Sequence, residues 1–153
     1  MTLDRILGVF RAHGDHRQRA LIRRLAKQPR LALPLLKIPA SGDYKPSVQR
    51  WAIEALGSMP EKLAWPLVAK ALCSPHMSVR LHALCAVGAF GNRRRASSIR
   101  PMLRDESGGI RINALGLVAH LRPPWLRQEL TRARADEKWY VRRLAEKLLA
   151  RPQ

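Results

Sequence analysis

The chain has 153 residues, the size of one domain with a single hydrophobic core. Hydrophobic residues make up 46 % of the sequence and aromatic residues only 5 %, which favours an all-α fold and disfavours a sheet protein. The net charge of +18 favours polyanions or acidic protein surfaces as partners and disfavours basic ones. No stretch approaches the ~20 apolar residues of a membrane span, so we expect no membrane partner.

The N-terminal segment, residues 1–14, predicts one amphipathic helix with Gly14 as its stop. Its first residues lack the basic segment and apolar run of a secretion signal, so we expect a cytoplasmic protein. A degenerate repeat follows over residues 15–44, because residues 31–35 resemble residues 63–67 at an offset of 32.

The rest of the chain repeats with a period of 31 residues. Three full repeats are expected at residues 45–75, 76–106 and 107–137, and a half repeat at residues 138–153. In each, apolar or Ala residues recur four and eight positions after a first apolar residue, namely Val48, Val79, Ile110 and Val141. The following position is small, so that a neighbouring helix can approach closely: Gly57, Gly88, Ala119 and Ala150. Turn residues and a second, leucine-containing helix come next, so each full repeat is expected to form a helical hairpin.

The motif Val-Arg-x-x-Ala-(Leu/Ala)-x-Ala-(Leu/Val)-Gly, complete at residues 79–88, resembles the HEAT-like repeats of bacterial proteins. The resemblance implies a single all-α domain over residues 1–153, a right-handed superhelix of about five antiparallel two-helix repeats. It also implies that an acidic residue before the Val-Arg helix pairs with the motif arginine and links neighbouring repeats. Asp105 and Asp136 match this acid ahead of Arg111 and Arg142, whereas Ser74 replaces it ahead of Arg80 and Gln49 replaces the arginine itself. We therefore expect the motif arginines, Arg80, Arg111 and Arg142, to be structural.

The family resemblance places the Val-Arg helices on the concave side of the superhelix. The motif positions that do not face the core then form a groove with an apolar middle and basic ends: Arg50, Trp51, Glu54, Leu81, His82, Cys85, Ile112, Asn113, His120, Arg143 and Lys147. Such a surface predicts binding of a protein segment with acidic flanks. The alternative is that its large apolar side chains pack on the adjacent repeat.

A second set of arginines is expected on the convex side, around the second helix of one repeat. Arg93, Arg100 and Arg104 have the spacing of one helical face, and Arg94 and Arg95 lie beside them at the turn. This stripe could contact phosphates or an acidic surface. The alternative is a solvated face that only increases solubility.

Catalytic chemistry is not indicated by the sequence. Cys73 and Cys85 have no metal-ligand spacing, and His82 and His120 have no nucleophile or carboxylate at a spacing typical of a triad or metal site, so we predict no catalytic residue, metal or cofactor. Alkylpurine DNA glycosylases are similar in their repeats, basic charge and cleft tryptophans, and they use a catalytic carboxylate, for which Glu54 would be the candidate here. Glu54 is equally explained by a helical pair with Arg50. Bilin lyases also resemble these repeats, yet nothing in the sequence indicates a tetrapyrrole pocket.

These observations predict a non-enzymatic HEAT-repeat scaffold that binds an acidic protein segment in its groove. The alternative is nucleic-acid binding through the basic surface, with a DNA glycosylase as its enzymatic form. The sequence indicates neither the partner's identity nor the oligomeric state.

Overall fold

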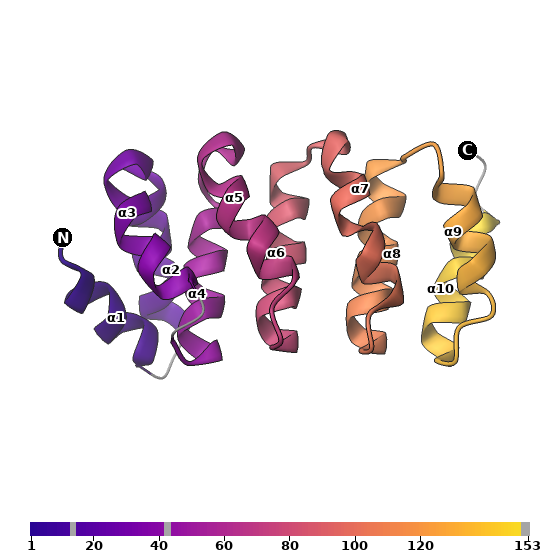
Figure 1. Ribbon diagram of the computed structural model, residues 1–153, viewed down its shortest axis with the longest axis horizontal. Coiled ribbons are helices and arrows are strands. Elements are labelled where there is room, and N and C mark those ends of the chain that lie inside the picture. The colour runs from indigo at the N-terminus through magenta and orange to yellow at the C-terminus, as the bar shows by residue number, and fades with distance from the viewer. Residues whose placement is uncertain (13–14, 42–43, 151–153) are drawn as a thin grey trace. The chain divides into compact units, whose positions relative to one another are not determined.

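The computed structural model describes residues 1–12, 15–41 and 44–150, and within these ranges every regular element is helical. The all-α expectation is therefore confirmed, while Gly14, the expected stop of the first helix, lies outside the described residues. The elements, shown in Figure 1, are α1 (Leu3–Arg11), α2 (Asp15–Ala26), α3 (Pro29–Ala40), α4 (Pro46–Gly57), α5 (Glu61–Leu72), α6 (Met77–Phe90), η1 (Arg93–Arg95), α7 (Ala96–Ile99), η2 (Arg100–Arg104), α8 (Gly108–Leu121), α9 (Leu126–Ala133) and α10 (Trp139–Leu149).

The helices form two compact units, Met1–Phe90 and Gly91–Gln153. In the first unit, α4 packs against α1, α2, α3, α5 and α6 and so lies at its centre. In the second unit, α10 packs against α8 and α9, and α8 also packs against η2 and α7.

The motif residues form the core as their spacing predicts. The four alanines of the motif, Ala52, Ala83, Ala114 and Ala145, are fully buried, and so are most of the apolar residues four positions on either side of them. Gly57 confirms the expected close approach of helices, because a Cβ atom at this position would lie 2.8 Å from the Cβ of Ala86 in α6. Small residues therefore set how closely α4 and α6 pack.

The first helix of the first repeat, α2, follows the 31-residue period. The sequence comparison gave an offset of 32 for this repeat. Gln18, Ile22 and Leu25 of α2 are buried, and they stand 31 residues before the buried Gln49, Ile53 and Leu56 of α4. The offset of 32 holds only for the second helix, where buried Ala32 and Leu36 of α3 correspond to buried Ala64 and Val68 of α5. The second repeat therefore has one extra residue between its two helices.

One expected helix is broken. The segment Arg93–Arg104 consists of η1, the short α7 and η2, whereas the arginine spacing assumed a continuous helix. Pro101 has no backbone N–H and cannot continue the helical hydrogen-bond ladder, which explains the change of winding beside it. The i, i+7, i+11 spacing of Arg93, Arg100 and Arg104 therefore does not place them on one helical face.

Candidate functional site

The residue after the first apolar position of the motif binds the loop that precedes its own helix. In each described case a side-chain nitrogen donates to a backbone carbonyl five, six or nine residues earlier. The residues are Gln18, Gln49, Arg80, Arg111 and Arg142, and all but Arg142 are buried. These contacts fix the turn before each helix, so they support the expectation that the motif arginines are structural.

Arg111 also forms a buried ion pair with acidic residues of the loop that precedes α10. Its Nε donates to Oδ2 of Asp136 at 2.8 Å, and its Nη2 donates to Oδ1 of the same carboxylate at 2.8 Å. The same Nη2 also donates to Oε1 of Glu137 at 2.9 Å. Hydrogen bonds from Arg111 lower the pKa of Asp136 against the opposing effect of burial, and Asp136 raises the pKa of Arg111. Asp136, which stands ahead of Arg142 in the sequence, thus bonds through its side chain to Arg111 of the preceding Val-Arg helix, α8, and links α8 to the start of α10.

A second ion-pair cluster contains two arginines of the expected phosphate stripe. Glu129 of α9 is 3 % exposed and accepts from Arg100 Nε at 2.7 Å and from Arg104 at 3.0 Å. Burial alone would raise the pKa of Glu129, but these hydrogen bonds outweigh it and lower the pKa. Arg100 also bonds to Gln128 and lies over the ring of Trp125. Arg100 and Arg104 of that stripe are thus already paired with a carboxylate.

The predicted groove residues of the first unit lie on α4 and α6. Trp51 is 4 % exposed and packs in the core, because α4 is surrounded by other helices, so it offers no surface to a partner. Arg50 was considered as a pair for Glu54, but its guanidinium lies 4.8 Å from the Trp51 ring centroid. Leu81 is half-buried.

Glu54, His82 and Cys85 project from the same two helices. His82 Nε2 lies 3.7 Å from Glu54 Oε2, a carboxylate neighbour that the sequence spacing did not indicate. Partial burial raises the pKa of the Cys85 thiol, and the charge of Glu54 raises it further, so the thiol is a poor nucleophile at neutral pH.

The predicted groove residues of the second unit lie on α8 and α10. Ile112 is half-buried, Asn113 bonds to the carbonyl of Gly109, and Arg143 and Lys147 are exposed. His120 lines a pocket. Among the described residues, no three His, Cys, Asp or Glu side chains gather as metal ligands would, and no described helix combines the length and apolarity of a membrane span.

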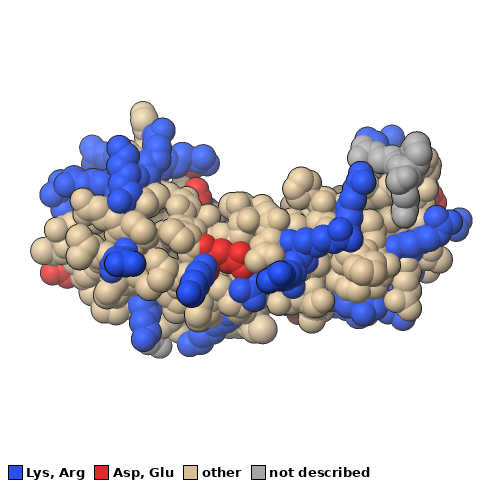
Figure 2. Space-filling model, turned by 90° about the horizontal axis from the view of Figure 1, so that it is seen from above, with Lys and Arg blue, Asp and Glu red and all other residues tan. Residues whose placement is uncertain are grey.

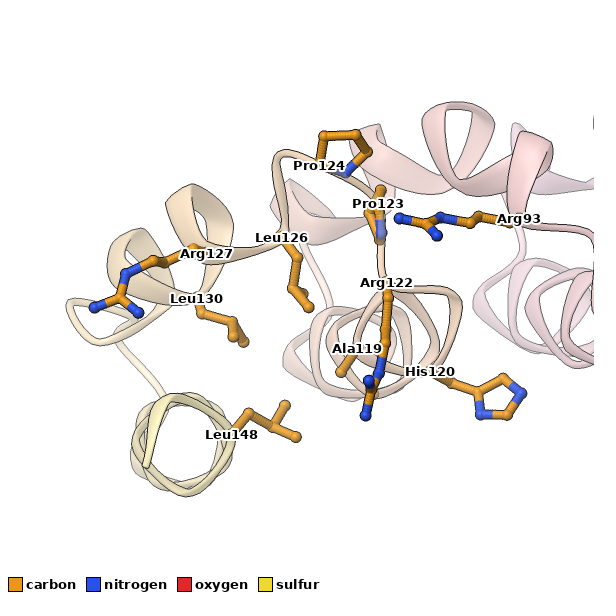
Figure 3. A pocket seen from close by; sticks show the side chains of 11 residues that line it. Arg93, Ala119, His120, Arg122, Pro123, Pro124, Leu126, Arg127, Leu130 and Leu148 are labelled. Carbon is orange, nitrogen blue, oxygen red and sulfur yellow. The ribbon is translucent and has the colours of Figure 1, made fainter. Parts of the chain in front are cut away.

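That pocket has a volume of about 550 Å³ and lies in the second unit, between the end of α8, the loop after it, α9 and α10. Leu126, Leu130 and Leu148 point toward one another and form an apolar floor (Figure 3). Arg93, Arg122 and Arg127 lie around them, and the described lining contains no carboxylate. The pocket thus joins Arg93 and His120, both predicted as binding residues, with two arginines that the motif did not indicate.

Arg122 has an unusual backbone conformation at the edge of this pocket. It follows the last residue of α8 with φ 50° and ψ 55°, in the left-handed region, and its N–H closes the helix on the carbonyl of Val118 at 2.9 Å. A glycine is the ordinary residue at such a position, because a Cβ atom is strained there. Strained residues are frequent at functional sites, which draws attention to Arg122.

The repeats match a known family. The profile described as HEAT repeats covers residues 32–118, more than half of the chain. The chain belongs to the HEAT-repeat family. The family resemblance of the motif is therefore confirmed, while a search of the curated proteins gave no match.

Two solved structures show the same HEAT-repeat type of α-solenoid fold. One is from the complex of CpcE and CpcF of phycocyanin lyase from Nostoc, with a TM-score of 0.53 and 22 % identity over 96 % of this chain and 63 % of that chain. The other is an engineered protein, with a TM-score of 0.55 and 14 % identity over 98 % of this chain and 79 % of that chain. This HEAT-repeat chain thus spans less than two thirds of the lyase chain. At these identities the likeness shows the fold.

Proposed function

We propose that the chain is a HEAT-repeat interaction module that binds an acidic protein segment in the arginine-lined pocket of its second unit. The observation that carries the proposal is the combination of three arginines, no carboxylate and a leucine floor in the described lining of one pocket. HEAT repeats usually serve as protein-interaction scaffolds, and the CpcE chain of similar fold was solved in a complex with a second protein, CpcF.

The chemistry of the pocket favours carboxylates next to an apolar side chain. Arginine binds carboxylates through two parallel hydrogen bonds, which are stronger than neutral ones. The three leucines provide the desolvated centre that an apolar anchor residue needs. A volume of about 550 Å³ accommodates a few side chains of a peptide, so the pocket fits a short segment with one apolar anchor and acidic flanks.

Binding of a labelled peptide tests this proposal. The probe is a peptide with a central leucine flanked by glutamates, and its counterpart carries glutamines in their place. The double variant R122Q/R127Q should bind the acidic peptide about 100-fold more weakly, because each charge-assisted bond contributes about tenfold. The variant R134Q/K138Q removes the same charge from exposed residues of the second unit that neither line the pocket nor belong to the predicted groove, and it should bind as the unchanged protein does.

Two results would contradict the proposal. Equal loss of affinity in both variants would mean that net charge alone attracts the peptide. Unchanged affinity in Leu148→Asp, with helicity retained, would mean that the peptide does not occupy the leucine floor.

A further inference from the structure

The outward face of α2 carries an unusual amount of positive charge. Among its twelve residues and the two that follow, the side chains opposite the buried Gln18, Ile22 and Leu25 are almost all basic and exposed. They are His16, Arg17, Arg19, Arg23, Arg24 and Lys27, with Arg30 exposed at the start of α3. We call these residues the α2 basic face. Figure 2 shows Lys and Arg side chains gathered at this end of the molecule.

None of these cations is neutralised within the part of the chain that the structure describes. Arg100, Arg104 and Arg111 each bind a carboxylate, whereas no residue of the α2 basic face forms an ion pair there. Arg19, Arg23 and Lys27 follow one another at i, i+4 and i+8, and like charges at this spacing destabilise a helix. Faces that only increase solubility usually mix both signs of charge, so this arrangement indicates an external polyanion.

The composition of the face distinguishes among polyanions. The uncharged exposed residues of this segment are Ala20 and Gln28, so it has neither the apolar anchor of a protein interface nor an aromatic ring on which a single-stranded base could stack. No large apolar side chain that could insert into a membrane is exposed on α2 itself; the exposed Leu31 belongs to α3. Five of its seven members are arginines, which bind phosphate oxygens through two hydrogen bonds at once.

We propose that the α2 basic face binds the phosphate backbone of double-stranded nucleic acid without sequence preference. Ten residues separate Arg17 from Lys27, which corresponds to about 15 Å along a helix. This length spans a major groove about 12 Å wide, so cations at the two ends of α2 reach phosphates on both of its sides. The proposal goes beyond peptide binding by the second unit and uses different residues, so either can fail alone.

The test is the salt dependence of binding of the full chain to a labelled duplex. Each neutralised phosphate adds about 0.9 to the slope of log affinity against log salt concentration. The triple variant R19Q/R23Q/K27Q should reduce the magnitude of the slope by about 2.7 and weaken binding at least tenfold at low salt. The control K37Q/K62Q/R134Q removes the same charge from exposed residues outside the α2 basic face and outside the predicted groove, and it should change the slope by less than about 1.

Three further measurements make the result decisive. Circular dichroism should show unchanged helicity in the triple variant, because only exposed side chains are altered. The unchanged protein should bind the duplex at least as tightly as one of its single strands, since the face has no stacking aromatic. Two other polyanions are tested in place of the duplex: vesicles that contain phosphatidylserine, and a polyglutamate peptide.

Several outcomes would overturn the proposal. One is an equal change of slope in the triple variant and its control. Another is a preference for the single strand. A third is a loss of binding to vesicles or polyglutamate in the triple variant while its affinity for the duplex is unchanged.

Discussion

Arginine and glutamine at the same motif position both bind loop carbonyls, but only arginine can bind a carboxylate as well. Gln49 bonds to the carbonyl of Tyr44, five residues earlier, and Arg111 bonds equivalently to that of Glu106. Arg111 has two further nitrogens directed at Asp136. The two residues thus fix the same turn, and arginine adds a link to the next repeat.

Removing this link should cost more than removing the loop contacts alone. Arg111→Ala leaves the carboxylate of Asp136 largely buried without a cation, so we expect the free energy of unfolding to fall by about 3 kcal/mol. Arg142→Ala removes bonds to carbonyls of its own loop and a charge near Asp136, but leaves the Arg111–Asp136 pair in place, and should cost about 1–2 kcal/mol. Urea unfolding measures both. Affinity for the acidic peptide should be unchanged, and a large loss of affinity at unchanged stability would give Arg111 a role in binding.

The buried carboxylates make stability depend on acid. Hydrogen bonds from Arg111 hold the pKa of Asp136 low, and bonds from Arg100 and Arg104 do so for Glu129 despite its burial. A carboxyl with a lowered folded pKa contributes stability above its unfolded pKa, and this contribution disappears as the pH falls through the folded pKa.

We therefore expect the free energy of unfolding to decrease as the pH falls below about 4. Glu129→Gln should be less stable than the unchanged protein at neutral pH, and the difference should shrink toward acid. Denaturant titrations at a series of pH values check this. A difference that is the same at every pH would show that the charge of Glu129 does not contribute.

Arg122 is expected to lower the stability of the fold while it strengthens binding of the acidic peptide. Arg122→Gly removes the strained Cβ atom, so the free energy of unfolding should rise by about 1 kcal/mol, while the acidic peptide binds more weakly. Arg122→Ala keeps the Cβ atom and should weaken binding without the gain in stability. Thermal unfolding measures the stability, and peptide titration measures the affinity, of the unchanged protein and the two variants. If the glycine and alanine variants are equally stable, the strain is absent.

At the scale of the elements, packing distance is set by single small residues. Alanine is a better helix former than glycine, yet Gly57→Ala would bring its Cβ atom to 2.8 Å from Ala86. We expect a loss of about 1–3 kcal/mol of stability, because α4 and α6 must move apart. Adding Ala86→Gly should restore part of the loss, measured by urea unfolding. A more stable Gly57→Ala would mean that helix propensity outweighs this contact.

The sequence predicts these elements well where one residue decides a boundary. Gly91, with φ of 63°, follows the end of α6, and Pro123–Pro124 follow the end of α8, as their chemistry requires. The break near Pro101 could not be predicted from the proline alone, because Pro34 and Pro66 lie inside the continuous helices α3 and α5. The first repeat was misaligned because its buried polar residue is Gln18, which does not match a Val-Arg motif.

The pocket could not be predicted from the repeat motif. Arg122 and Arg127 lie in the loop after α8 and in α9, outside the motif positions that were assigned to the groove. The available signal was an arginine directly before two prolines at a helix end, a place where glycine is usual. Trp51 was assigned to the groove because motif periodicity alone does not reveal that α4 is surrounded by other helices.

At the scale of the whole chain, an excess of eighteen positive charges opposes folding through self-repulsion. Raising the salt concentration from about 0.01 M to about 0.1 M shortens the screening length from about 30 Å to about 10 Å. We expect the thermal midpoint to rise by a few degrees over this range. The variant R19Q/R23Q/K27Q should show a smaller rise, because it lacks one of the densest groups of unpaired cations. A midpoint that falls with salt would mean that surface ion pairs outweigh the repulsion.

The choice between glutamine and arginine also decides which repeats can stand next to each other. Ser74 occupies the place that Asp136 holds two repeats later, and Gln49 occupies the place that Arg111 holds two repeats later. These two departures from the family motif are therefore one matched change. A repeat with glutamine needs no acid ahead of the next Val-Arg helix, whereas the repeat with Arg111 requires one. When repeats of this chain are duplicated or transplanted, two residues therefore decide whether neighbouring repeats are compatible. One is the glutamine or arginine of the motif, and the other is the residue ahead of the next Val-Arg helix.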